Sequence, residues 1–291
     1  MDWILYGLLL IGGAALYVAC GYFPAHLPVF LPWDFSWIVY LSTALALIWY
    51  FRGCARLAEP PPWWRTLFYV IGVAAIYAVM QTRYDYWSQH MFFIHRFQHL
   101  VLHHLGPFLI ALSVPDDALW VGMPEFFRAP LTSRPVRATV DVIQNPFVAP
   151  LLFVGLIYLW LAPAIHARVM LDANLYDLMN WSMAIDGIFF WSLILDPRPK
   201  PPARLAPFWR ALMIIAVVPP QILVGAMLAL TQRDIYPVYE ICGRLFPISA
   251  ITDQHYGGLI LWIPSSMMSV IGLILVLNFM RLNEENSDVA A

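Results

Sequence analysis

Long apolar segments are the feature that most restricts the folds open to this chain. Hydrophobic residues make up 61% of the 291 residues, charged residues only 12%, and the mean hydropathy is +0.69. A chain with so little charge is not a soluble domain of this size. Several segments reach the roughly 20 apolar residues that cross a hydrocarbon core, and within lipid such segments must be helical. The sequence therefore predicts an all-α, multi-pass integral membrane bundle.

The apolar segments and the polar, Pro-containing loops between them predict about eight transmembrane helices. The expected ranges are 3–23, 35–51, 64–82, 89–113, 146–165, 176–195, 208–231 and 256–280. The first range is long enough to span the membrane and no basic region precedes it, so we interpret it as a membrane helix and not as a signal peptide. We expect residues 1–282 to form one transmembrane domain and residues 283–291 a flexible polar tail.

The Lys and Arg residues are divided unevenly between the two sides of the predicted bundle. Eleven lie in one set of loops and near the C-terminus: Arg52, Arg56, Arg65, Arg128, Arg134, Arg137, Arg198, Lys200, Arg204, Arg210 and Arg281. Four lie in the opposite loops: Arg83, Arg168, Arg233 and Arg244. Because cytoplasmic loops carry the excess of positive charge, this division predicts that both termini are cytoplasmic.

Five of the eight histidines lie in one apolar segment, His90–Pro107. In an α-helix, His95, His99 and His103 fall along one stripe, and Met91 lies one turn before His95. Two imidazoles at positions i and i+4 can bind one metal ion, and a thioether is a soft ligand that suits Cu(I). The spacing therefore predicts a copper site on this helix.

A packing role is the plainer interpretation of any single histidine in a helix. Ionisable groups at membrane depth are costly, however, and usually face a cavity or a site. Five histidines in one membrane segment, with Arg96 among them, therefore favour a functional site. We predict that the metal ligands centre on His95 and His99, with Met91 and His103 as further candidates.

The triplet Asp253-Gln254-His255 opens the last expected helix. Asp253 can be the N-cap of that helix, because its carboxylate can accept hydrogen bonds from free backbone N–H groups. Alternatively, Asp253 and His255 are partners of the metal site, with the carboxylate orienting an imidazole. Gly257 and Gly258 are expected to let a neighbouring helix approach closely.

Polar side chains also occur on the sixth expected helix. Asp186 lies about 14 Å further along this helix than Asp177, too deep for solvation, so we expect a buried partner such as Arg96 or a histidine. Met179 and Met183 form an i, i+4 pair for which core packing is favoured over copper binding. Six residues are left open as additional members of the site: Asp177, Asn180, Asp186, His90, His104 and His166.

The three cysteines, Cys20, Cys54 and Cys242, form no Cys-x-x-Cys pair. They indicate neither a thiolate metal site nor a disulfide framework, and we expect no disulfide between Cys20 and Cys242. The chain also has no feature that indicates nucleic-acid binding.

Several short motifs occur in a characteristic order. They are His95-Arg-Phe-Gln-His99 with Gly106-Pro107, Leu159-Trp160 with Pro163, Phe190-Trp191 with Leu195-Asp196-Pro197, Tyr236-Pro-Val-Tyr239-Glu240, Asp253-Gln254, Gly257-Gly258 and Trp262-Ile-Pro264. Together they resemble the CtaG family of cytochrome c oxidase assembly factors, from about the third expected helix to the eighth.

This resemblance implies a non-enzymatic role in maturing cytochrome c oxidase, with delivery or insertion of copper, in the bacterial cytoplasmic (inner) membrane. The implied partners are oxidase subunits, periplasmic copper chaperones as donors, and membrane lipid; the oligomeric state is left open. Many members carry histidines near positions 161 and 180, where this chain has Leu161 and Asn180. His103, His104 and His166 are the candidates to replace them.

Two other functions remain open from the sequence. The histidine spacing is similar to the histidine boxes of membrane metal oxidases, although no second box is present and one helix offers too few ligands for two metals. A haem-binding redox protein with histidine pairs on neighbouring helices is the other alternative.

Overall fold

The computed structural model describes residues 2–241 and 243–290, and within them every regular element is a helix, as the sequence predicts. The last helix continues through residues 283–290, which the sequence assigns to a polar tail. In chain order the elements are α1 (Asp2–Tyr22), η1 (Pro24–His26), α2 (Trp37–Cys54), α3 (Trp63–Gln81), α4 (Arg83–Ser88), α5 (Phe92–Leu100), the π-helix η2 (Val101–Leu105), α6 (Gly106–Ser113), α7 (Asp116–Gly122), α8 (Glu125–Leu131), α9 (Arg134–Ile143), α10 (Val148–Leu161), α11 (Pro163–Val169), α12 (Ala173–Ile194), α13 (Pro207–Leu230), η3 (Pro237–Glu240) and α14 (Ala250–Ala290).

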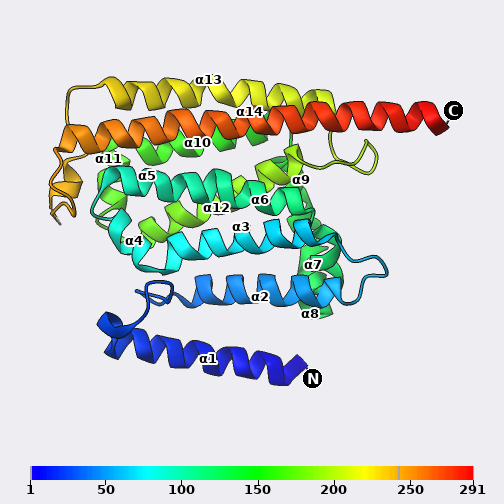
Figure 1. The fold of residues 1–291 in the computed structure, drawn as a ribbon, viewed down its shortest axis with the longest axis horizontal. Coiled ribbons are helices and arrows are strands. Elements are labelled where there is room, and N and C mark those ends of the chain that lie inside the picture. The colour runs from blue at the N-terminus through cyan, green and yellow to red at the C-terminus, as the bar shows by residue number, and fades with distance from the viewer. Residues whose placement is uncertain (1, 242, 291) are drawn as a thin grey trace.

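The long helices run side by side along one direction, with α13 and α14 at one edge of the bundle and α1 at the opposite edge (Figure 1). One end of the bundle carries α4 and α11, and we call it the α4 end. The other end carries α7, α8, α9 and both ends of the drawn chain, and we call it the terminal end. Helix α5, which carries the histidine pair, begins at the α4 end and lies between α3, α12 and α14.

Five described helices are long and apolar enough to cross a membrane: α1, α2, α3, α13 and α14. Two bent pairs raise the number to seven, the segment α5–α6 with α7 at 78° and α9 with α10 at 75°. Helix α12 is 22 residues long but is not among them. It buries polar side chains such as Asn180 and Asp186 in the bundle, and these lower its hydropathy. The multi-pass architecture is confirmed, whereas the expected number of eight spans is not.

The histidine helix is interrupted by the π-helix η2, which the sequence analysis treated as regular α-helix. Pro107 lacks a backbone N–H, and its ring disfavours an α-helical turn against the carbonyl four residues earlier, that of His103. The His103 carbonyl instead accepts a hydrogen bond from Trp191 Nε1 at 3.2 Å. Gly187 lets α12 come this close, since a Cβ there would lie 2.6 Å from the same oxygen. The wider turn changes the direction of the side chains that follow it.

Two adjacent glycines allow α14 to pack closely against α5 and α13, as the sequence predicts. A Cβ on Gly257 would lie 2.3 Å from the Phe92 ring of α5. A Cβ on Gly258 would lie 2.4 Å from the backbone N of Ala229 and 2.8 Å from the carbonyl O of Gly225, both on α13. Small residues therefore bring α14 into backbone contact with α13, as in other membrane helix pairs.

We predict that Gly258→Ala lowers the free energy of unfolding by about 1–3 kcal/mol, because the new methyl group meets backbone that cannot move aside without separating α13 from α14. Gly155→Ala is the matched control, since nothing lies within 4 Å of a Cβ there and helix propensity favours alanine by up to about 1 kcal/mol. Thermal or denaturant unfolding in detergent measures both. Equal stability of the two variants would contradict the close packing.

Candidate metal site

Asp253 fixes the start of α5, the helix that carries the candidate ligands. Its carboxylate accepts hydrogen bonds from the backbone N–H groups of Phe92 at 3.0 Å and Phe93 at 2.8 Å. Arg244 forms an ion pair with the same carboxylate. Asp253 is therefore a capping residue, but it caps α5 and not its own helix, which begins earlier at Ala250.

The His95 and His99 rings lie against each other, as their spacing predicts. Their Nε2 atoms are 3.0 Å apart, and the relative exposures are 0% and 5%. His95 Nδ1 lies 2.7 Å from the Tyr239 hydroxyl, which lies 3.0 Å from His166 Nε2. His166 Nδ1 in turn lies 2.9 Å from the Trp160 carbonyl oxygen. A single chain of hydrogen bonds thus joins three histidines from α5 and α11.

The carbonyl at the end of this chain sets the direction of each hydrogen bond. Burial, and then the charge of Arg96, lower the pKa of His166 to about 3, so its ring is neutral with one N–H. A carbonyl only accepts, so that N–H is at Nδ1 and the Tyr239 hydroxyl donates to Nε2 of His166. Tyr239 must then accept from His95 Nδ1. With one proton on each imidazole, His95 Nε2 accepts from His99 Nε2, which leaves His99 Nδ1 as a lone pair.

Two further groups surround the histidine pair. Met170 Sδ lies 3.9 Å from the Tyr239 hydroxyl, which places a soft sulfur beside this hydrogen-bond chain. Asn180 of α12 lies beside the His99 ring and the Tyr176 hydroxyl. Its Oδ1 is buried without a hydrogen-bond partner, as is His99 Nδ1. The polar groups around His99 therefore have unused hydrogen-bonding capacity on the side of the ring that does not contact His95.

His103, the third histidine of the predicted stripe, has a partner on α12. Its Nε2 lies 3.0 Å from Asp186 Oδ2, and its ring stacks on Phe153 with 3.9 Å between centroids. This contact confirms that Asp186 has a buried histidine partner.

The other predicted ligands lie in different surroundings. Met91 is fully buried at the N-cap of α5, where its carbonyl accepts from the His95 backbone N–H at 3.1 Å. His255 Nε2 contacts the Thr231 carbonyl oxygen at 2.9 Å, at the end of α13. Within residues 2–241 and 243–290, no group of three or more His, Cys, Asp and Glu side chains is placed to hold a metal ion. The structure thus joins His95 with His99 directly. As metal ligands, all six residues remain predictions: Met91, His95, His99, His103, Asp253 and His255.

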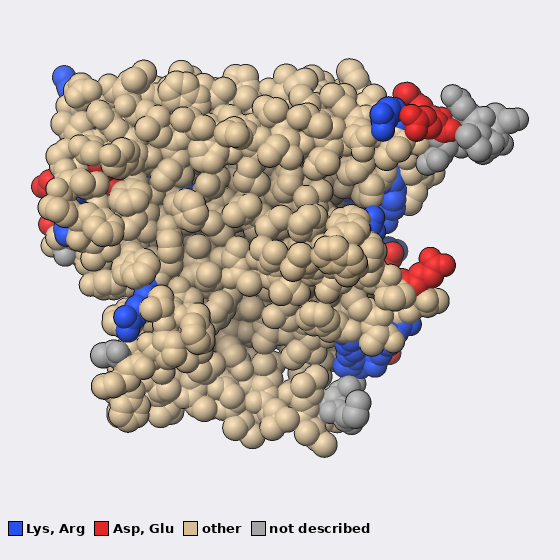
Figure 2. All heavy atoms as spheres, viewed as in Figure 1, with Lys and Arg blue, Asp and Glu red and all other residues tan. Residues whose placement is uncertain are grey.

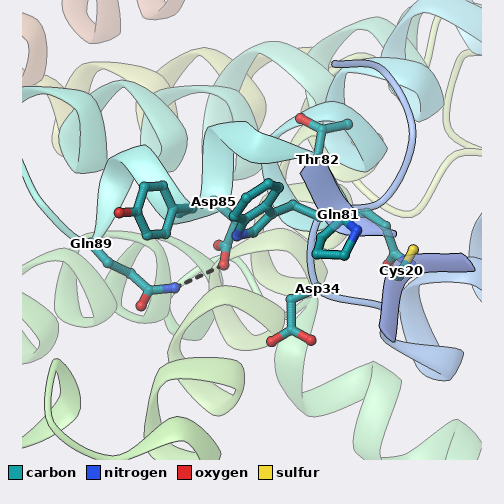
Figure 3. Close-up of a pocket in the computed structure, with 9 residues that line it drawn as sticks. Cys20, Asp34, Gln81, Thr82, Asp85 and Gln89 are labelled. Atoms are coloured by element: carbon teal, nitrogen blue, oxygen red, sulfur yellow. Dashed lines mark hydrogen bonds between the residues drawn. The ribbon is translucent and has the colours of Figure 1, made fainter. Parts of the chain in front are cut away.

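A second polar cluster, which the sequence analysis missed, links this region to the α4 end. Asp85 Oδ1 accepts from Gln98 Nε2 at 2.7 Å and from the Tyr176 hydroxyl at 3.0 Å. Its Oδ2 accepts from Gln89 Nε2 at 3.0 Å, the hydrogen bond drawn in Figure 3. Burial raises the pKa of Asp85 to about 6. The one signal in the sequence was Gln98, a polar residue directly before His99 in an apolar segment.

Asp85 also lines a pocket of about 320 Å³ at this end of the bundle. Figure 3 shows this pocket with Cys20 of α1 and Gln81 at the end of α3. The ring of Tyr176 lies 5.8 Å from that of His95. Asp85, Gln98 and Tyr176 therefore reach from the pocket to the His95 ring.

The model of a known protein family, cytochrome c oxidase caa3 assembly factor (Caa3_CtaG), matches residues 48–281. The chain belongs to the Caa3_CtaG family. The match includes the histidine pair, Tyr239 and Asp253, whereas α1 and Cys20 lie before it. The sequence resemblance to this family is thereby confirmed.

The curated relatives that match this chain are much longer than it. An uncharacterized protein of Mycobacterium leprae (strain TN) is 23% identical over 258 residues, which are 84% of this chain and 39% of the relative. Uncharacterized proteins of Mycobacterium bovis and Mycobacterium tuberculosis are each 25% identical over 252 residues, 82% of this chain and 38% of the relative. This chain spans about two fifths of the length of these relatives. No solved structure matches the chain significantly.

We predict that Asp85 makes stability depend on pH. Because its pKa is about 6 in the folded protein and ordinary in the unfolded chain, the folded state binds the proton more strongly. Its contribution to stability is therefore greatest at acid pH and is lost as the pH rises through 6. Between pH 5 and 7 the difference is about 1 kcal/mol.

Asp85→Asn should remove this part of the pH dependence, and unfolding in detergent at pH 5, 6 and 7 measures it. Asp34→Asn, which changes an exposed carboxylate of the same pocket, is the control. If Asp85→Asn has the same pH slope as the unchanged protein, the carboxylate does not titrate in this range.

Proposed function

We propose that this Caa3_CtaG protein is a non-enzymatic factor that accepts copper and passes it to cytochrome c oxidase during assembly. The direct contact between His95 and His99, buried at 3.0 Å inside the bundle, is the observation that carries the proposal. The family description names cytochrome c oxidase, which is therefore the proposed client. Copper is here the cargo, and the two imidazoles are its holders.

The donor set favours copper over other metals. Structural zinc takes four protein ligands and catalytic zinc takes three, whereas His95 and His99 bring together two ring nitrogens among the residues that the structure describes. Imidazole suits copper, and a thioether adds to the preference for Cu(I), which Met170 and the predicted ligand Met91 can offer. A site with few protein ligands leaves positions open for groups of a donor or acceptor protein. Such a site is suited to exchange of the ion.

The hydrogen-bond chain also offers a way to free both ring nitrogens. A metal ion shared by His95 Nε2 and His99 Nε2 requires His99 to give up its Nε2 proton. His99 can carry that proton on Nδ1 instead and donate it to the unpartnered Oδ1 of Asn180. The pair then accepts the ion with no net release of a proton and without disturbing Tyr239 or His166.

The alternative functions have less support. A cavity beside the inner histidines, lined by His99, His103 and His104, has room of about 10 Å³, on the order of one water molecule. A haem requires a far larger cavity. A metal oxidase with two ions requires more ligands than the described residues bring together.

We further propose that the protein lies in the bacterial cytoplasmic membrane with eight spans and with both termini in the cytoplasm. Figure 2 shows more basic side chains at the terminal end than at the α4 end of the face in view. This distribution agrees with eleven Lys and Arg residues in the expected cytoplasmic parts and four in the opposite loops. The histidine pair then lies toward the periplasmic end, where periplasmic copper chaperones can supply it.

Labelling of single cysteines in spheroplasts tests this orientation, in a chain whose three native cysteines are replaced by serine. We expect Gln232→Cys at the α4 end to react with an impermeant thiol reagent in intact spheroplasts. Lys200→Cys at the terminal end should react only after lysis. The opposite pattern would place the termini outside the cytoplasm.

The copper site is tested on protein purified without oxygen and titrated with Cu(I) against a chelator. We expect His95→Ala with His99→Ala to reduce the affinity for Cu(I) at least tenfold, because the two imidazoles are the proposed holders. His90→Ala is the control, since His90 contacts the Gly243 carbonyl oxygen at the edge of the bundle. His255→Ala and Met91→Ala decide whether these predicted ligands contribute.

The same double variant is then the only copy of the protein in cells that make the client oxidase. The oxidase should contain haem but too little copper, and added copper should partly restore its activity by mass action. A fully copper-loaded, active oxidase would show that the histidine pair is structural and that the protein assists assembly in another way.

A further inference from the structure

Arg96 is a buried cation for which the described part of the chain provides no anionic partner. It lies next to His95 on α5, has a relative exposure of 4%, and its guanidinium lies 5.2 Å from the centre of the Phe92 ring. Its Nε and Nη2 atoms are buried and make no hydrogen bond. Guanidinium N–H groups can only donate, so at least two strong donors are unsatisfied here.

Arg96 lines a small cavity between α5, η2, α10, α12 and α14. It does so together with His99, His103, His104 and Ser265. Both ring nitrogens of His104 are buried without a partner, and one of them is an N–H donor in a neutral imidazole. The cavity is thus lined by a cation and by several polar groups that lack partners.

The nearby carboxylates are already engaged elsewhere. Asp186 interacts with His103, and Asp253 interacts with Arg244 and the first N–H groups of α5. Burial of an unpaired charge away from water is strongly unfavourable. Water in the cavity can satisfy hydrogen bonds, but it does not neutralise the guanidinium.

We infer that this cavity is a binding site for a small monovalent anion of the halide class, held by Arg96 with donors from His104 and Ser265. The room of about 10 Å³ admits a monatomic ion with slight expansion and excludes phosphate, carboxylates and lipid headgroups. The anion neutralises the guanidinium inside the bundle. The inference does not depend on copper and can hold or fail independently of the proposed function.

Copper-free protein in detergent, with a chelator present, tests the site. Unfolding is compared in potassium chloride, potassium bromide and potassium gluconate at equal ionic strength. We expect chloride and bromide to raise the unfolding temperature by about 2 °C or more and to saturate, because they bind only the folded state. Arg96→Gln, which keeps a polar side chain without charge, should abolish the difference between the salts.

Arg83→Gln is the matched control. Arg83 also lies against an aromatic ring, that of Trp33 at 4.8 Å, but at the α4 end and outside the cavity, so this variant should keep the chloride response. A chloride response that is absent from the unchanged protein, or that persists in Arg96→Gln, would overturn the inference.

Should Arg96→Gln not fold, crystals of the unchanged protein grown in bromide decide the question. An anomalous peak within hydrogen-bonding distance of Arg96 supports the site, and its absence refutes it.

Discussion

The candidate site depends on the hydrogen bonds that the Asp253 carboxylate accepts from the start of α5. The carboxylate comes from α14, yet it holds the first backbone N–H groups of α5, so two helices more than 150 residues apart in sequence are joined at one point. Gly257, one turn later on α14, permits the close contact with the Phe92 ring. This arrangement sets the position of α5 and, with it, the direction of His95 and His99.

The site then follows from the need to satisfy polar groups away from water. His95 contacts Tyr239 from η3, Tyr239 contacts His166 from α11, and the Trp160 carbonyl ends the chain. A carbonyl can only accept a hydrogen bond, and each neutral imidazole has one N–H. The Trp160 carbonyl therefore determines which nitrogen of each histidine carries the proton. The one open nitrogen in this hydrogen-bond chain is His99 Nδ1, and Asn180 lies beside the same ring. A buried polar group without a hydrogen-bond partner is where a bound ligand can stabilise the protein most.

Two kinds of unsatisfied group meet near His99. On one side lie ring nitrogens suited to a soft metal ion, and on the other lies the guanidinium of Arg96, which repels a cation. An anion beside Arg96 would weaken that repulsion, so the two proposed sites are compatible in charge. Their separate donors nevertheless allow each to be tested without the other.

Local features of the sequence were sufficient to predict the parts of the structure that depend on helical periodicity and composition. Low charge and long apolar segments predicted an all-helical membrane bundle, the i, i+4 spacing predicted contact between His95 and His99, and adjacent glycines predicted the close packing of α14. The depth of Asp186 predicted a buried partner, although it did not distinguish Arg96 from a histidine. These conclusions need only the geometry of one helix and the cost of placing charge in lipid.

The tertiary structure decided what depends on contacts between distant segments. Asp253 caps α5 instead of its own helix. Tyr239 of η3 and His166 of α11 join His95 from short helices whose positions no periodicity specifies. His103 contacts Asp186 of α12 through its ring. Its backbone carbonyl, which Pro107 leaves without an α-helical N–H partner, accepts a hydrogen bond from Trp191, 88 residues away. The sequence by itself determined which polar groups enter the membrane. Only the packing of the helices decided which of them meet a partner, because away from water a polar group is satisfied only where the fold places a donor or an acceptor beside it.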